Sequence, residues 1–203
     1  MLNIRRITHS SEPTWQQCVT IYRDVFPSDE REPEAILCDG IDSGEYHLWI
    51  AEQQGKVVGF YILSLYPDFN YVLFSYLAVA ANKQGHGIGR DLCRHAITTG
   101  QSSVNAKWLL VEAQARQAIY YGQLGFLMLQ YCYLAPSFDS TDSIPMSLMA
   151  ISSDNQIKHI EINELNAIVS HLFTVGYQLA PSDQRLEQQL SRQQTPIALI
   201  AWG

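Results

Sequence analysis

The stretch Gln84-Gly85-His86-Gly87-Ile88-Gly89-Arg90 governs how the rest of this sequence is interpreted. It lies between an apolar, strand-like run at 71–79 and a helix-like run at 88–99. Glycines at alternate positions allow positive φ angles and keep side chains away from the turn. The first N–H groups of the following helix have no intrahelical partner and point into that turn. Oriented N–H groups and the helix dipole favour an anion there, most simply a diphosphate.

Two common phosphate loops do not have this spacing. A P-loop needs a Lys-Ser/Thr pair after its last glycine, and none follows Gly89. The dinucleotide fingerprint needs G-x-G-x-x-G, which these glycines do not form. The pattern Q/R-x-x-G-x-G/A after a strand resembles the acetyl-CoA loop of the GNAT superfamily of N-acyltransferases. Taken alone, the loop fits a simple helix-opening turn equally well, so other segments must decide.

A second segment is similar to the same superfamily. Ala118-Ile119-Tyr120-Tyr121-Gly122-Gln123-Leu124-Gly125-Phe126 resembles its A-x-x-F/Y-Y-x-x-x-G-F motif. Gly125 is expected to end a helix in the left-handed conformation before a strand begins. The resemblance implies that Tyr121 donates a proton to the departing coenzyme A thiolate. The alternative is that Tyr121 is an aromatic core residue.

The strand before the glycine loop ends in Tyr76-Leu77-Ala78-Val79, which resembles the x-L-A-V ending of the superfamily. The resemblance implies that this backbone pairs with the pantetheine arm like an added strand. One N–H there would polarise the thioester carbonyl. The implied chemistry is direct attack of a neutral amine on acetyl-CoA, since no cysteine lies beside a base in either motif. The expected coenzyme site is Leu77, Ala78, Val79, Gln84, Gly85, His86, Gly87, Ile88, Gly89 and Arg90.

The sequence departs from the family pattern where the general base is concerned. The stretch 73–76 (Leu-Phe-Ser-Tyr) carries no carboxylate, although this strand often does in the superfamily, and Ala115 stands where an Asn is common. Glu112, at the end of a predicted strand over 107–112, is the first candidate base. His86 is expected to line the phosphate loop rather than act as a base.

Asp29 and Glu30 are the next candidates, in the segment between the first two predicted helices. The segment 26–31 (Phe-Pro-Ser-Asp-Glu-Arg) resembles an F-P-x-x-E-R feature of some superfamily members, in which this loop overhangs the acceptor cleft. A solvated turn explains the same residues equally well.

Hydrophobic periodicity predicts the order β-αα-βββ-α-β-α-ββ over the first 150 residues. This order is of the α/β (α+β) class. It resembles the order of the GNAT fold, and the resemblance implies a mixed, mostly antiparallel sheet flanked by helices. The last two strands are expected at 126–134 and 146–151. We expect an acetyltransferase domain at 1–151 and a helical C-terminal appendage at 152–203, with a short apolar tail at 196–202. The appendage serves packing in the simplest interpretation, and homodimerisation or covering of the substrate in the alternative.

Composition narrows the class of function. The chain has 203 residues, of which 47% are hydrophobic, and a net charge of −7. Without a Lys/Arg run it is not expected to bind nucleic acid. No apolar stretch is long enough for a membrane span, and we expect neither a span nor a signal peptide. The cysteines at 18, 38, 93 and 132 have no metal-ligand spacing, so we expect mostly buried, reduced thiols, no metal and a cytoplasmic location.

These observations predict an N-acetyltransferase that uses acetyl-CoA and a small-molecule or peptide-like amine. The alternative is a non-catalytic acyl-CoA sensor or scaffold, because the coenzyme loop is intact while the base is not assigned. The sequence leaves open the acceptor, the oligomeric state and whether the acyl group is strictly acetyl.

Overall fold

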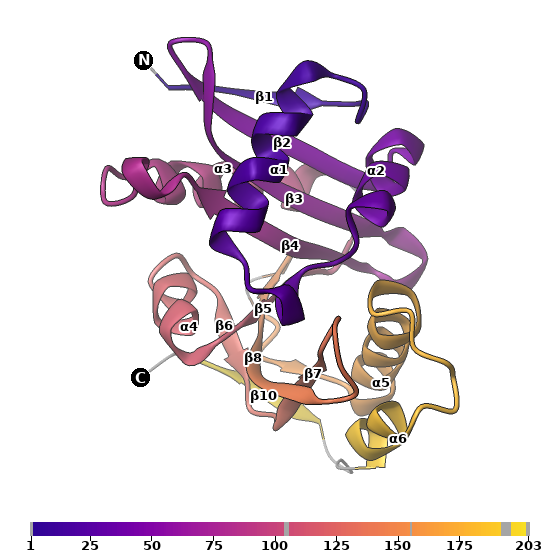
Figure 1. The fold of residues 1–203 in the computed structure, drawn as a ribbon. Coiled ribbons are helices and arrows are strands. Elements are labelled where there is room, and N and C mark those ends of the chain that lie inside the picture. The colour runs from indigo at the N-terminus through magenta and orange to yellow at the C-terminus, as the bar shows by residue number, and fades with distance from the viewer. Residues whose placement is uncertain (1, 104–105, 155, 192–195, 202–203) are drawn as a thin grey trace. The chain divides into compact units, whose positions relative to one another are not determined.

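A computed structural model describes residues 2–103, 106–154, 156–191 and 196–201. As predicted, the fold is of the mixed α/β class, with mostly antiparallel strands flanked by helices (Figure 1). The chain forms two compact units. The first comprises residues 1–66 and 72–105, and the second comprises residues 67–71 and 106–203.

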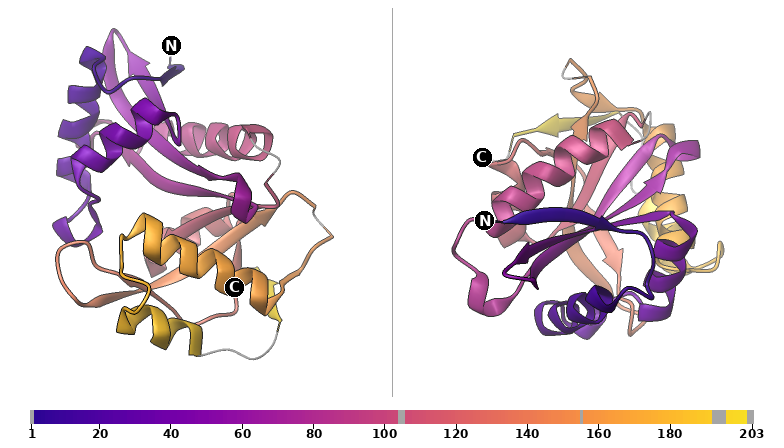
Figure 2. Two further views of the ribbon diagram at one scale, coloured as in Figure 1. Left: turned by 90° about the vertical axis from the view of Figure 1, so that its right-hand side faces the viewer. Right: turned by 90° about the horizontal axis from the view of Figure 1, so that it is seen from above.

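The strands of the first unit lie in the order β1-β2-β3-β4. Helices α1 and α2 cover one face and α3 covers the other (Figure 2). The elements are β1 (Asn3–Ile7), α1 (Pro13–Val25), the 3-10 turn η1 (Ser28–Glu30), α2 (Glu34–Ser43), β2 (Tyr46–Gln53), β3 (Lys56–Tyr66), β4 (Tyr71–Val79), the 3-10 turn η3 (Ala81–Lys83) and α3 (Ile88–Ser103). Apolar residues at helical spacing in α1 face the sheet, and they are Trp15, Cys18, Val19 and Tyr22.

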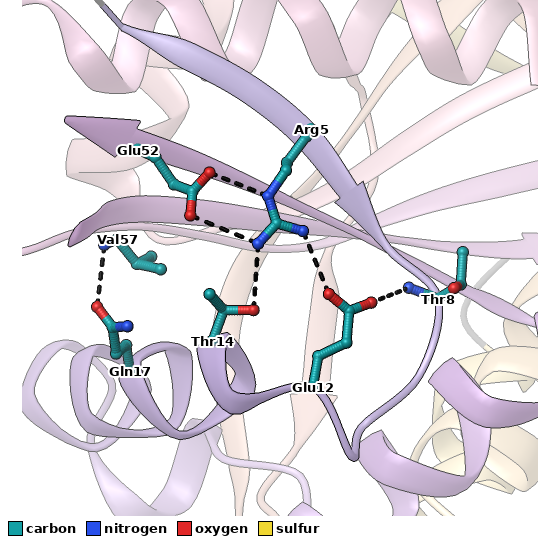
Figure 3. Close-up of polar contacts among 7 residues, drawn as sticks. All are labelled: Arg5, Thr8, Glu12, Thr14, Gln17, Glu52 and Val57. Atoms are coloured by element: carbon teal, nitrogen blue, oxygen red, sulfur yellow. Dashed lines mark hydrogen bonds and ion pairs between the residues drawn. The ribbon is translucent and has the colours of Figure 1, made fainter. Parts of the chain in front are cut away.

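A polar cluster fixes where α1 begins (Figure 3). The Arg5 guanidinium on β1 donates to Glu52 on β2 at 2.9 Å and to Glu12 at 3.2 Å. The second Glu12 oxygen accepts the Thr8 backbone N–H at 3.2 Å. Pro13 follows as the first helical residue, where its missing N–H has no cost. Partly exposed ion pairs of this kind contribute at most about 1 kcal/mol each, so their main effect is to orient the helix.

The second unit has the strand order β5-β8-β6-β10-β9, and β7 pairs with β8. Its helix α4 packs against β5, β6 and β8. The elements are the 3-10 turn η2 (Pro67–Phe69), β5 (Trp108–Ala113), α4 (Ala115–Gly122), β6 (Leu127–Leu129), β7 (Tyr133–Pro136), β8 (Ser143–Ser152), β9 (His159–Ile160), α5 (Ile162–His171), a π-helical turn η4 (Leu172–Gly176), α6 (Gln184–Ser191) and β10 (Ile197–Ile200).

The single strand predicted at 126–134 is wrong, because the chain forms β6 and β7 with a break between them. Segments far along the chain form hydrogen bonds with the backbone groups near the break. The Gln130 N–H donates to the Ala198 carbonyl at 2.9 Å, and the Gln189 side-chain amide donates to the Cys132 carbonyl at 3.0 Å. The predicted apolar tail contains β10, which pairs antiparallel with β6, and Trp202 lies outside the described residues.

The described residues after 151 belong to the second unit. Glu164 on α5 binds Lys107 at 2.8 Å and accepts the Trp108 indole N–H at 2.8 Å. The His171 ring at the end of α5 lies 2.8 Å from the Tyr71 hydroxyl. The boundary at 151 and any further role of residues 152–203 stay predictions. No helix among the described residues has the length and apolar character to cross a bilayer.

Candidate functional site

Two of the three glycines of the loop have the positive φ angle that the sequence predicts, whereas Gly89 lies inside helix α3. Gly85 and Gly87 have φ angles of 78° and 83°, in the left-handed region that L side chains rarely adopt. A Cβ added at either glycine would have no other heavy atom within 4 Å. Helix α3 then begins at Ile88, and the Asp91 N–H donates to the Gly87 carbonyl at 3.1 Å. The first α3 N–H groups therefore face a loop with open space beside two glycines, which suits an anion.

The end of β4 is tied to this loop. The Gln84 side-chain amide donates to the Val79 carbonyl at 3.1 Å. Leu77 and Val79 are half-buried, whereas Ala78 between them is buried. His86 folds back on the loop, with Nδ1 2.8 Å from the Gln84 carbonyl. The hydrogen bond from Gln84 to Val79 thus joins the two groups of predicted coenzyme residues, the end of β4 and the glycine loop.

Gly59 on β3 is a supporting residue that the sequence reasoning missed. A Cβ at this position would lie 2.7 Å from the Ala78 carbonyl oxygen and 3.4 Å from the Val79 Cα. Glycine therefore permits β4 to approach β3 closely at the end of β4. The only signal in the sequence was a glycine inside a strand pattern, which often marks such an approach.

Tyr121 is held by the way α4 ends. Gly125 has a φ angle of 103°, the Phe126 N–H donates to the Tyr121 carbonyl at 3.1 Å, and the Gly125 N–H donates to the Gly122 carbonyl at 3.2 Å. This is the Schellman pattern, with the expected hydrophobic contact between its ends. The Tyr121 and Phe126 ring centroids are 5.5 Å apart, edge to face. The spacing Tyr-x-x-x-Gly-Phe thus has a local structural cause, and it leaves the Tyr121 side chain 8% exposed.

Glu112 near the end of β5 is held by two tyrosine hydroxyls. Its Oε1 accepts hydrogen bonds from Tyr133 at 2.5 Å and from Tyr177 at 3.0 Å. Tyr177 follows η4, so the segment after residue 151 supplies one of the two donors. The two bonds fix the orientation of this carboxylate.

The predicted acceptor residues Asp29 and Glu30 lie in η1 and are half-buried. This turn is attached to β4, because the Tyr76 hydroxyl donates to the Glu30 carbonyl at 3.3 Å and accepts the Glu32 N–H at 3.1 Å. The connection between α1 and α2 therefore touches the strand one residue before Leu77.

Glu32 is the residue of this connection that the sequence reasoning did not single out. Its side chain is 5% exposed, and its Oε1 accepts the Tyr46 hydroxyl at 3.1 Å. The Tyr22 hydroxyl donates to its main-chain carbonyl at 3.1 Å. Burial raises the pKa of Glu32 to about 7, against a lowering contribution from the Tyr46 hydrogen bond. No sequence pattern marked it, because it follows the charged residues of an apparently solvated turn.

The raised pKa of Glu32 gives the first testable prediction, on stability. The folded protein holds this proton more tightly than the unfolded chain between the ordinary pKa of 4.5 and about 7. The contribution of Glu32 to the free energy of unfolding is therefore greatest below that pH window. It falls as the pH rises through the window and is constant above it. Since one pKa unit corresponds to about 1.4 kcal/mol, the Glu32→Gln variant should gain about 3 kcal/mol relative to wild type across the window.

Urea unfolding of both proteins from about pH 4 to about pH 8 measures this gain. All other titrating groups are shared, so they cancel in the difference. Stability curves that stay parallel across this range would show that Glu32 does not carry the shift.

The four cysteines are free thiols in the structure. Cys18 and Cys93 are buried, and burial raises the pKa of each to about 12, so neither is a thiolate nucleophile near neutral pH. Cys38 is half-buried and Cys132 is exposed, so the expectation of burial holds for only two of the four. In the described parts of the chain no three His, Cys, Asp or Glu residues gather as metal ligands would. The absence of a metal remains a prediction.

The first unit thus brings the coenzyme segment, η1 and Glu32 together, and the second unit holds Glu112 and Tyr121. Residues 44–127 match the family model described as "Acetyltransferase (GNAT) domain". The matched range contains the end of β4, the glycine loop, Glu112 and Tyr121, and it leaves out Asp29, Glu30 and Glu32. The chain matches no curated protein.

Solved structures share the fold. A GNAT-family acetyltransferase from Bacteroides thetaiotaomicron superposes with a TM-score of 0.71 at 18% identity, covering 88% of this chain and 99% of that one. An acyl-CoA N-acyltransferase from Pseudomonas aeruginosa gives 0.59 at 20% identity, with coverage of 75% and 100%. A GNAT family acetyltransferase from Elizabethkingia anophelis, solved with acetyl-CoA bound, gives 0.53 at 16% identity, with coverage of 74% and 97%.

Proposed function

We propose that this chain, whose residues 44–127 match the GNAT acetyltransferase model, transfers the acetyl group of acetyl-CoA to an amine of a small-molecule or peptide-like acceptor. The observation that carries the proposal is the glycine loop. Gly85 and Gly87 have left-handed backbones with open space beside them, directly before the sixteen-residue helix α3. An anion-binding helix N-terminus joined to the end of a strand is what a diphosphate followed by an extended pantetheine arm requires.

In this proposal the N–H groups from Gly85 to Arg90 bind the diphosphate. Leu77 and Val79 offer main-chain N–H and C=O groups to the pantetheine amides, and one N–H polarises the thioester carbonyl. The Elizabethkingia anophelis neighbour, which has the same fold, was solved with acetyl-CoA bound, and this supports the choice of coenzyme.

The acyl transfer itself is proposed as direct attack in a ternary complex. The amine nitrogen forms a bond to the thioester carbon, the carbon–sulfur bond breaks, and its electron pair leaves on sulfur. Tyr121 donates a proton to that sulfur. Glu112, held by Tyr133 and Tyr177, is proposed as the general base that takes the proton of the attacking amine, directly or through water. Asp29 and Glu30 are proposed as acceptor-binding residues. The buried thiols Cys18 and Cys93 do not favour a covalent intermediate.

The acceptor class follows from charge. With a net charge of −7 and no Lys/Arg run, the protein suits a cationic amine rather than a nucleic acid. A cytoplasmic location, independence from membranes and homodimerisation through residues 152–203 remain expectations from the sequence.

The second candidate is a non-catalytic acyl-CoA sensor, which the missing carboxylate on β4 favours. A panel of primary amines and small peptides, assayed for thiol release from acetyl-CoA, separates the two when it is combined with binding calorimetry. We expect coenzyme A to bind and at least one amine class to be acetylated. Binding without turnover across a broad panel would favour the sensor.

A further inference from the structure

Two successive arginines on β1 have opposite surroundings. Arg5 faces α1, and Glu52 and Glu12 bind its guanidinium at 2.9 and 3.2 Å (Figure 3). Burial lowers the pKa of Arg6, and no described carboxylate offsets this effect. The Arg6 Nε atom is buried and has no hydrogen-bond partner among the described residues. The described part of the chain thus satisfies Arg5 and leaves the Nε–H of Arg6 without an acceptor.

The residue directly across from Arg6 also has a donor without an acceptor. Trp49 on β2 is the Cα partner of Arg6, so the two side chains leave the sheet on the same face. The ring centroids of Trp49 and His95 are 4.7 Å apart, so this is the face that α3 covers (Figure 2). The Trp49 Nε1 atom is buried and finds no hydrogen-bond partner in the ranges that the structure describes. Two neighbouring N–H donors therefore share one environment.

The side chains around these donors bring no negative charge. Burial, followed by the charge of Arg6, lowers the pKa of His47 to about 4. The Tyr61 hydroxyl, on β3 opposite Trp49, lies 2.6 Å from the Nδ1 atom of His95. Burial raises the pKa of Tyr61 and lowers that of His95. These three groups are uncharged near neutral pH, and none of them balances the charge of Arg6.

We propose that Arg6 and Trp49 form a binding site for an oxyanion, the phosphate or carboxylate group of a small molecule. A guanidinium presents its N–H groups as a planar fork that matches two oxygens of such a group. The indole N–H is a donor only, so it adds a further hydrogen bond to an oxygen. We call this pair the β1–β2 oxyanion site, and it does not depend on the proposed acetyl transfer.

The environment of the β1–β2 oxyanion site favours an anion over a neutral ligand. A buried donor without an acceptor costs the full desolvation of that group, and an oxyanion removes this cost at both donors. Hydrogen bonds between a guanidinium and an anion are shorter and stronger than those between neutral groups. Arg6 and Trp49 are half-buried as whole residues, so the site borders the solvent. The flexible stem of Arg6 allows its guanidinium to turn and admit the ligand.

The test follows the indole N–H resonance of Trp49 in a ¹H–¹⁵N NMR spectrum, where its loss in Trp49→Phe identifies it. Inorganic phosphate and acetate are titrated separately into the full chain at constant ionic strength. We expect the resonance to move with at least one of the two anions and to reach a plateau. Saturation at the lower concentration of phosphate would assign a phosphate group, and saturation at the lower concentration of acetate would assign a carboxylate.

Variants of the cations separate this site from a general effect of charge. Arg6→Gln should weaken the binding by about tenfold or more, since it removes hydrogen bonds to a charged group. Arg6→Lys keeps the charge without the fork, so it should also weaken the binding. Arg94→Gln is the matched control, because it removes an exposed cation from α3 and should leave the titration unchanged. Gly87→Asp should leave it unchanged as well, because the glycine loop is a separate proposed anion site.

Three results would overturn the β1–β2 oxyanion site. If the Trp49 resonance responds to neither anion, water or the protein itself satisfies both donors. If Arg94→Gln weakens the binding as much as Arg6→Gln and Arg6→Lys do, the response reflects net charge. If Gly87→Asp abolishes the response, the anion binds in the glycine loop instead. None of these results bears on whether the protein transfers an acetyl group.

Discussion

Replacing Gly87 by aspartate is expected to weaken coenzyme A binding by on the order of 10²-fold or more. At a φ angle of 83° a side chain costs about 1–3 kcal/mol, so the loop relaxes and its N–H groups turn away from the ligand. The added side chain enters open space, which we assign to the diphosphate, and it brings a negative charge to the helix N-terminus. Since about 1.4 kcal/mol is tenfold in affinity, a combined cost of about 3 kcal/mol from the two effects corresponds to a loss on the order of 10²-fold.

Calorimetric titration with coenzyme A at fixed salt measures this effect. Gly87→Asn is the control for charge, because asparagine has nearly the same size and tolerates the left-handed region better than most residues. Gly55→Asp is the control for strain, since Gly55 has a φ angle of 75° and open space in the β2–β3 turn. We expect Gly87→Asn to lose less affinity than Gly87→Asp, and Gly55→Asp to lose none. If Gly87→Asp kept the wild-type affinity for coenzyme A, the diphosphate would not bind to this loop.

Replacing Tyr121 by phenylalanine is expected to lower kcat by on the order of 10²-fold or more. The change keeps the ring that packs edge to face against Phe126 and removes only the hydroxyl. Because the hydroxyl acts on the departing sulfur, the affinity for coenzyme A should change little. Single-turnover kinetics, in which the chemical step is isolated from product release, measures the effect.

Tyr120→Phe provides the comparison for Tyr121→Phe. Tyr120 lies on the same helix, and its ring packs edge to face against Tyr121 at 5.5 Å. The Tyr120→Phe variant should keep the wild-type rate of acetyl transfer. If Tyr121→Phe also keeps the wild-type rate in single turnover, Tyr121 is a core aromatic residue and another group protonates the thiolate.

The features that the sequence predicted well are those with local causes. Positive φ at Gly85, Gly87 and Gly125 follows from glycine in turns that begin or end a helix. Pro13 begins α1 for a comparable local reason, since proline fits a first helical turn.

What escaped prediction depends on contacts between distant segments. The strand break near Gln130 is set by Ala198 and Gln189, which no local pattern relates to it. Glu32 appeared to belong to a charged turn, and only the packing of Tyr46 and Tyr76 against it shows that it is buried. The roles of Tyr121 and Glu112 rest on resemblance, because their local structure explains where they lie and not what they do.

The most direct test of acetyl transfer is to follow the label from acetyl-CoA that carries ¹³C at its carbonyl carbon. After incubation with the protein and an amine that it accepts, mass spectrometry should find the label in the acetylated amine, in equal amount to free coenzyme A. The intact protein should keep its unlabelled mass at every time, because the amine attacks the thioester directly. A label that passes through a cysteine of the protein would contradict direct attack, and a label that stays on coenzyme A with every amine tested would contradict the proposed activity itself.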